Sequence, residues 1–301
     1  MKIARLLSII IMLSLAAMAG CQTSAPQGDI IDDLGRNVQI KNVPQRIISL
    51  SPSNTEIVYA LGLEDRLIGV TTYCNYPPEV KDKIQVSQFS NIDIEKVVAL
   101  EPDLILADSL HEADVIPALE RLGITVLAIN PATMEDILAD IGMIGRAAGQ
   151  TESAESLIAS LRNRTKAVTD RTAGLESEEK YRTFFVTWHD PIWTAGNGTL
   201  IDDIITMAGG TNIAADVKGH SQIDLETVIQ RNPQVILVLS SMGTQDNSYN
   251  YIKTEPRFQA TDALKNDMVY MVDADIISRT TPRSVDGLEQ IAKIIHPELF
   301  P

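Results

Sequence analysis

Cysteines and cations are scarce in this sequence, and each scarcity excludes a class of protein. Two cysteines among 301 residues are too few for a zinc or iron–sulfur site built on about three or four thiolates, and too few for a disulfide scaffold. Lys and Arg total 25 against 40 Asp and Glu, which gives a net charge of −15. This balance opposes a broad nucleic-acid-binding face, because phosphate neutralisation needs clustered cations. With 45% apolar and 22% charged residues, the chain is neither a disordered tail nor a multi-span membrane protein.

Motifs of common enzymes are absent as well. The sequence has no GxxxxGK[ST] phosphate loop, no GxGxxG and no GxSxG nucleophile elbow. The four histidines stand far apart, without an HxH or HExxH pair: His111, His189, His220 and His296. An exported metal-dependent hydrolase stays open as an alternative, and it requires His111, His189 and His220 to converge on a metal ion.

Residues 1–20 have the features of an export signal. Lys2 and Arg5 form a cationic start, and an apolar run with small residues at its end leads to Cys21. The run is too short to cross a bilayer comfortably, which takes about 20 residues. The segment resembles a bacterial lipoprotein signal, in which the cysteine becomes the lipidated first residue; the alternative is an ordinary secretory signal followed by a chance cysteine. Cleavage before Cys21 removes two positive charges and changes the net charge from −15 to −17, and residues 21–29 are then a flexible lipidated tether.

A sequence repeat divides the rest of the chain into two similar halves. Residues 92–107 and 223–238 are identical at seven of sixteen positions, at a constant offset of 131. Each copy predicts one or two helical turns, then a proline, then a buried strand. The offset is too long for a solenoid repeat, so it indicates two lobes of similar design.

Apolar runs alternate with helical patterns in both lobes, which predicts an α/β fold with mostly parallel sheets. For an N-terminal lobe of residues 30–132 we expect a helix that is capped by Ser53 or Asn54 and ends at Gly62. Its other expected elements are strands Ile47–Leu50, Leu67–Thr71, Leu104–Ala107 and Ile124–Ile129, and a helix near Glu112–Leu122. For a C-terminal lobe of residues 179–301 the expected elements are strands Phe184–Thr187, Val235–Leu239 and Met268–Val272, and helices Leu200–Ala208, Leu225–Gln230 and Ser284–Ile295.

Residues 133–178, between the lobes, have a helical pattern. Thr133 and Asp136 form a start that is similar to a capping box. A second helix is expected over Glu152–Ala173, where apolar residues recur at helical spacing. A helix of this length is roughly 33 Å long, about the width of a small domain. One rigid helix that bridges two lobes would restrain large hinge motion.

Three segments carry a resemblance to a known family. They are SLSPSNTEIVYALGLEDRLIGVTTYCNYPPEV (49–80), VSQFSNIDIEKVVALEPDLILA (86–107) and SRTTPR (278–283). They resemble the periplasmic vitamin-B12-binding proteins of ABC importers, within the wider class of solute-binding proteins for corrinoids, haem and iron–siderophores. The resemblance extends from about Ile30 to Ile295. It implies two Rossmann-like α/β lobes joined by one long interdomain helix, with the ligand in the cleft between them.

The same resemblance implies which residues contact the ligand. Tyr73 stands where the family has a pocket tyrosine, and Phe89 stands where it has a pocket tryptophan. The other positions that match the family's pocket, the last two at the polar rim of the ligand, are Trp188, Trp193, Asp275 and Arg279. Flat aromatic side chains suit a large planar ligand. The alternative for both tryptophans is a packing role in the core or between the lobes.

Asp108 and His220 stand where the family has tryptophans, so the ligand is open between a corrinoid and the alternatives, haem or a ferric siderophore. A neutral His220 imidazole could bind cobalt or iron as an axial ligand, whereas most loop histidines are only solvated. Asp108 could accept hydrogen bonds from ligand amides, or it could cap a helix. No resident cofactor or metal is expected.

Glu95 and Glu226 occupy equivalent places in the repeat, one in each lobe. In the family, glutamates at these places pair with arginines of the membrane permease, and symmetric acids suit docking to a two-fold symmetric partner. The alternative is that both only stabilise the N-terminus of a helix.

These observations predict a binding protein rather than an enzyme. We expect it to be exported and anchored in the cell envelope by lipidated Cys21, on the periplasmic or outer face of the membrane. It would capture a corrinoid and deliver it to an ABC importer, a permease with its ATPase. A sensor that signals to a membrane partner is an alternative. Cys74 would be a lone thiol, buried or half-buried.

Overall fold

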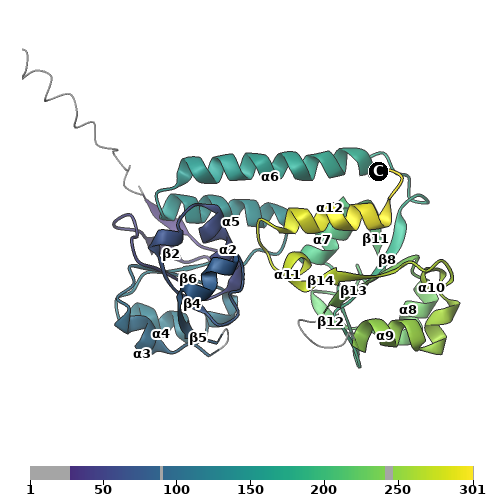
Figure 1. The fold of residues 1–301 in the computed structure, drawn as a ribbon, viewed down its shortest axis with the longest axis horizontal. Coiled ribbons are helices and arrows are strands. Elements are labelled where there is room, and N and C mark those ends of the chain that lie inside the picture. The colour runs from purple at the N-terminus through teal and green to yellow at the C-terminus, as the bar shows by residue number, and fades with distance from the viewer. Residues whose placement is uncertain (1–27, 89–90, 241–246, 301) are drawn as a thin grey trace, which may run out of the picture.

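The computed structural model describes residues 28–88, 91–240 and 247–300. Two α/β lobes lie side by side beneath one long helix (Figure 1). Cys21 and Phe89, named above, fall outside the described residues. Within the described ranges, no helix is both long enough and apolar enough to cross a membrane.

The N-terminal lobe is built on a five-stranded parallel sheet with the strand order β5-β4-β3-β6-β7. Most of its strand residues are buried, as expected for a parallel sheet covered on both faces. The strands are β3 (Ile47–Ser49), β4 (Leu67–Thr71), β5 (Ile84–Ser87), β6 (Leu104–Ala107) and β7 (Val126–Ala128). The helices are α2 (Pro52–Ala60), α3 (Ile94–Ala99) and α4 (Val115–Arg121), and a short hairpin of β1 (Asp29–Ile31) and β2 (Asn37–Gln39) precedes them.

The C-terminal lobe has a four-stranded parallel sheet with the strand order β11-β8-β13-β14. These strands are β8 (Tyr181–Val186), β11 (Gly210–Asn212), β13 (Val235–Ser240) and β14 (Val269–Asp273). The helices are α7 (Leu200–Met207), α8 (Leu225–Arg231), α9 (Asn247–Thr254), α10 (Asp262–Lys265), α11 (Ala274–Ile277) and α12 (Ser284–Ile295). A small antiparallel sheet, in the order β12-β10-β9, consists of β9 (Trp188–His189), β10 (Ile192–Ala195) and β12 (His220–Gln222).

Several sequence predictions need correction. Ser51, not Ser53 or Asn54, caps α2, because Pro52 takes the first helical position and the Ser51 hydroxyl accepts the Asn54 N–H. The helix expected near Glu112–Leu122 is shorter and follows a separate 3-10 turn. The two tryptophans, for which no strand was predicted, lie on the short strands β9 and β10.

The internal repeat is also a repeat of structure. Asp93 caps α3 and Asp224 caps α8, and each carboxylate accepts the backbone N–H three residues later, at 3.0 and 2.7 Å. Glu101 and Asn232, again 131 positions apart in the sequence, have φ values of 47° and 43°. In both copies the helix is therefore followed by a residue in the left-handed conformation at the equivalent position, directly before the proline that precedes the next strand.

Two long helices connect the lobes: α5 (Met134–Ala147) and α6 (Thr151–Thr172). The predicted capping box of Thr133 and Asp136 at the start of α5 is confirmed. Figure 1 shows that α6 runs over α5 on one lobe and over α12 on the other. Arg164 of α6 binds the carboxylates of Asp286 and Glu289 on α12 at 2.6 and 2.8 Å.

One apolar core runs through both lobes. Its buried residues include Ile57 and Leu106 of the N-terminal lobe, Leu161 of α6, and Leu237 and Ile291 of the C-terminal lobe. A separate apolar cluster covers the other face of each large sheet. Because a shared core resists the sliding of one lobe against the other, the lobes are packed together as well as linked by the chain. Cys74 is a buried free thiol, as expected, and its sulfur lies 3.1 Å from the Thr55 hydroxyl.

Candidate functional site

The residues predicted to bind a ligand follow the carboxyl ends of parallel strands. Tyr73 follows β4, Asp108 follows β6, Trp188 follows β8 and Asp275 follows β14. Carboxyl ends of parallel strands share one edge of a sheet, and ligands of α/β proteins bind outside that edge. Residues from these edges of the two lobes line common hollows, so the edges face each other across an interlobe cleft.

One hollow of about 370 Å³, here the Asp108 hollow, brings four predicted residues together. They are Tyr73 and Asp108 from the N-terminal lobe and Asp275 and Arg279 from the C-terminal lobe. The rest of its lining is small or polar: Ser51, Pro52, Ser53, Ala274 and Ser278. Asp108 also caps a 3-10 turn, and its carboxylate accepts the Leu110 N–H at 2.9 Å. The capping and pocket-lining roles considered for Asp108 are therefore compatible.

A second hollow of about 310 Å³, here the His220 hollow, adjoins the first, because Ser278 lines both. His220 on β12 and Thr199 before α7 face Asn130 of the opposite lobe across it. His220 is exposed at the surface of the hollow, and desolvation by the surrounding protein lowers its pKa below the ordinary value of 6.5. At neutral pH the imidazole is therefore uncharged and able to bind a metal through a ring nitrogen.

The small antiparallel sheet carries both predicted tryptophans, and neither is among the residues that line the two hollows. Trp193 lies directly opposite Trp188 on one side and Gln222 on the other, and His220 lies opposite Ala195. Directly paired residues and residues two apart share a face of a sheet, so both tryptophans lie on the face of His220. Trp188 is 47% exposed, and its indole N–H donates to the Asp190 carbonyl at 2.8 Å. Trp188 is thus not a core residue, and Trp193 is half-buried.

A cluster of polar side chains crosses between the lobes beside the Asp108 hollow. This interlobe cluster consists of Glu56, Asn75, Asp275, Arg279 and Arg283. The Glu56 carboxylate, whose side chain is 2% exposed, accepts two hydrogen bonds from Arg283, at 2.6 and 2.7 Å. Asn75 donates to Asp275 at 2.8 Å and accepts from Arg279 at 2.6 Å. Hydrogen bonding to Glu56 raises the pKa of Arg283.

Sequence reasoning missed three members of the interlobe cluster: Glu56, Asn75 and Arg283. The signal available in the sequence was the spacing of four between Arg279 and Arg283. The burial of Glu56, which requires a cationic partner, is seen only in the structure. Arg279 itself was expected at the rim of the ligand. It lines the Asp108 hollow, its side chain is 13% exposed, and it pairs with Asp275 at 2.8 Å, so its charge is largely compensated by the protein.

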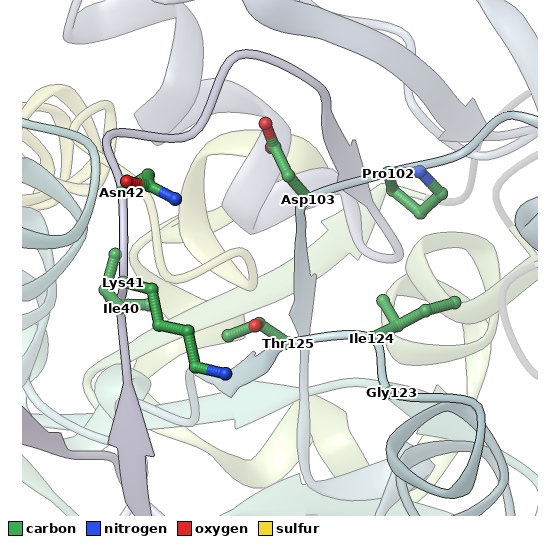
Figure 2. A pocket seen from close by; sticks show the side chains of 8 residues that line it. All are labelled: Ile40, Lys41, Asn42, Pro102, Asp103, Gly123, Ile124 and Thr125. Carbon is green, nitrogen blue, oxygen red and sulfur yellow. The ribbon is translucent and has the colours of Figure 1, made fainter.

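A hollow of about 290 Å³ lies at the other edge of the N-terminal sheet. Figure 2 shows its lining, with Lys41 and Asn42 on one side and Asp103, Gly123 and Thr125 on the other. Asp103 precedes β6, whereas Asp108 follows it, so this hollow is at the opposite end of the strand from the cleft. The Asp103 carboxylate already accepts the Gln45 and Arg46 N–H groups, at 2.8 and 2.9 Å, and it has a structural role.

The histidines do not converge. His111 is buried and accepts the Asp108 N–H, while His189 lies against the Ser248 hydroxyl at 3.0 Å. Among the residues that the structure describes, no group of three His, Cys, Asp or Glu side chains could hold a metal ion. The arrangement required for the hydrolase alternative is therefore not found in the described part of the chain.

The two glutamates of the repeat are exposed on opposite lobes. Glu95 lies in the first turn of α3 and Glu226 in the first turn of α8. The Glu226 side chain is 75% exposed and pairs with Arg257 at 3.0 Å. Both side chains are accessible to a partner, although their helix positions also satisfy the simpler role of N-terminal acids.

Comparison with known proteins shows what the chain is similar to. A family model described as periplasmic binding protein matches residues 47–276. The Bacillus subtilis protein YvrC, an uncharacterized ABC transporter substrate-binding lipoprotein, is 34% identical over 311 residues, which cover 96% of each chain. A vitamin B12-binding protein of Vibrio cholerae is 30% identical over 249 residues, 82% of this chain and 87% of the relative. A solved Staphylococcus epidermidis protein, described as a possible iron-binding (periplasmic solute-binding) protein, has a TM-score of 0.75 and 29% identity; the match covers 85% of this chain and 100% of that chain.

Proposed function

Because the chain belongs to the periplasmic binding protein family, we propose that it captures a corrinoid outside the cytoplasmic membrane and delivers it to an ABC importer. The observation that carries the proposal is the pair of adjoining hollows between the lobes, lined by residues that follow the carboxyl ends of strands in both sheets. Capture requires affinity and release only, and no bond of the ligand is made or broken.

The shape and chemistry of a corrinoid suit this cleft. A corrin is a large plate with apolar faces and amide arms. Trp188 and Trp193 are paired on the small sheet, and in the proposed complex their indoles would cover the planar ligand at low entropy cost. Tyr73, 55% exposed, offers a third ring from the opposite lobe. Asp275 and Arg279 provide polar partners for the arms.

Haem or a ferric siderophore is the second candidate within the same function. The observation in its favour is the uncharged His220 imidazole in a hollow between the lobes, because a neutral imidazole is a common ligand of iron and of cobalt. The Staphylococcus epidermidis protein of similar fold, described as possibly iron-binding, adds support to this candidate.

The membrane side of the proposal concerns three further residues. Residues 1–20 would act as the export signal and residues 21–29 as a tether from lipidated Cys21, in line with the lipoprotein description of the Bacillus subtilis relative. Glu95 and Glu226 would dock one lobe each onto the permease, which works with its ATPase. Replacing each glutamate by glutamine should abolish uptake in cells without changing ligand affinity.

Ligand titration monitored by tryptophan fluorescence tests the proposal. Cyanocobalamin, cobinamide, haemin and a ferric siderophore are added in turn, and we expect strong quenching by the corrinoids. Arg279→Ala should weaken corrinoid binding at least about tenfold, the effect of losing roughly 1.4 kcal/mol of contact energy. Lys41→Ala is the control: Lys41 lines the hollow on the other edge of the N-terminal sheet, so this substitution should leave corrinoid affinity unchanged. Absence of quenching by every corrinoid would refute the corrinoid assignment.

A further inference from the structure

Arg279, the cation that lines the Asp108 hollow, is already neutralised by other parts of the protein. Its guanidinium pairs with Asp275 at 2.8 Å and with Glu56 at 3.4 Å, and it donates to Asn75 at 2.6 Å. Behind it, Arg283 is held by Glu56 and lies 3.8 Å from the Tyr76 ring centre. The two arginines and the two carboxylates balance in charge. A ligand carboxylate would have to share the Arg279 guanidinium with Asp275.

The remaining charged group of the Asp108 hollow is acidic. The Asp108 carboxylate lines it, and His111 lies 3.3 Å away. The ring nitrogen of His111 that faces this carboxylate accepts the backbone N–H of Asp108 at 3.1 Å, and a nitrogen in this acceptor role has no proton to donate to the carboxylate. The described lining of both hollows therefore contains Asp108, Asp275 and a single, paired Arg279, and it has an excess of negative charge.

Resting on the proposed binding function, we propose that Asp108 and Asp275 make the cleft select a ligand whose polar arms are uncharged hydrogen-bond donors, such as the amides of a corrinoid, and reject the same plate with carboxylate arms. Carboxylate oxygens have several acceptor positions for amide N–H groups. A ligand carboxylate would instead meet like charge in a partly desolvated site, which is strongly unfavourable.

This selection deepens the proposed function, because it separates candidates that share a planar shape. Haem carries two carboxylate arms and a corrinoid carries mainly amides, so the charge of the cleft favours the corrinoid although His220 could bind the metal of either. Asp108 is then a specificity-determining residue that stands where the resembling family has a tryptophan.

Two matched pairs of ligands isolate the charge of the arms. Cobinamide and cobyrinic acid share the corrin ring but carry amide and carboxylate arms, respectively; haemin and its dimethyl ester share the porphyrin plate. Calorimetry on the wild-type protein should show cobinamide binding at least about tenfold tighter than cobyrinic acid, given the energy of one close like-charge contact. Asp108→Asn should reduce the ratio of the affinity for cobinamide to the affinity for cobyrinic acid at least about threefold. Glu112→Gln makes the same charge change on an exposed residue four positions away, and it should leave the ratio unchanged.

The outcomes distinguish this proposal from the proposed function. The charge selection would be overturned, while corrinoid binding stands, if the wild type bound cobinamide and cobyrinic acid with equal affinity. It would also be overturned if Asp108→Asn left the ratio of these two affinities unchanged. If no corrinoid binds but the haemin ester binds tighter than haemin, the corrinoid assignment fails and the charge selection holds. If no corrinoid binds and haemin binds tighter than its ester, or if none of the four probes binds, both proposals are overturned.

Discussion

The stability of the protein should rise when one buried carboxyl group of α5 is replaced by an amide. Asp140 is 1% exposed, and one of its oxygens is buried without a hydrogen-bond partner among the described residues. Burial, the charge of Asp33 and a hydrogen bond with the Asp33 side chain raise the pKa of Asp140 from 3.8 to about 9. At neutral pH the folded protein therefore keeps a proton on Asp140, and the carboxyl group donates to Asp33.

The proton on Asp140 makes unfolding pH-dependent in a definite direction. Between pH 3.8 and about 9 the folded state holds this proton and the unfolded state does not, so the free energy of unfolding falls as the pH rises. At about 1.4 kcal/mol per pH unit, this loss reaches roughly 4 kcal/mol at pH 7 as an upper limit. An asparagine needs no proton to donate to Asp33, so Asp140→Asn should stabilise the protein by about 2–4 kcal/mol at pH 7.

Urea denaturation of the wild type and Asp140→Asn at pH 5, 6, 7 and 8 measures this difference. The gain should shrink toward pH 5 and grow toward pH 8. The control is Glu155→Gln, an exposed acid on α6, which should change the free energy of unfolding little at any of these pH values. If the effect of Asp140→Asn does not vary with pH, or if the variant is less stable at pH 8, the reasoning about the buried proton is wrong.

Two further predictions concern the contacts that hold the lobes together. Glu56→Gln should destabilise the protein by about 3 kcal/mol in urea denaturation, because removing one partner leaves buried arginine charge uncompensated; a change near zero would contradict the importance of the interlobe cluster. Gly145→Ala should destabilise by about 1–3 kcal/mol, because its Cβ would lie 2.4 Å from the Ala154 Cβ of α6. Gly142→Ala, with its nearest contacts at 3.5 Å, is the matched control and should gain about 0.5–1 kcal/mol from helix propensity; similar effects of both changes would contradict the packing argument.

Seven of the fourteen described strands and most helices could be predicted because their signals are local, whereas the short strands β1, β2, β5, β9, β10, β11 and β12 were not predicted. The buried strand β6 was located from four apolar residues followed by a polar one, and α5 from the Thr133 capping box. The bridging helix α6 was predicted one residue away from its position at each end. The start of α2 was misplaced because three neighbouring residues, Ser51, Ser53 and Asn54, can all serve as caps.

The candidate site was only partly predictable from the sequence. Tyr73, Asp108 and Asp275 each follow a strand, so the rule that carboxyl ends share an edge brings them together. The partnership of Glu56 with Arg283 joins residues 227 positions apart in the sequence, and no local pattern shows which acid meets which arginine. The small sheet that aligns Trp193 with Trp188 and Gln222 likewise depends on pairing between segments that are short and weakly patterned.

The most direct test of the account is calorimetric titration of cobinamide into the exported form of the protein. We expect saturable binding of one ligand per chain, weakened by Arg279→Ala and by Asp275→Asn but not by Lys41→Ala. Absence of binding, or binding that all three substitutions leave unchanged, would contradict the claim that the cleft between the lobes captures a corrinoid.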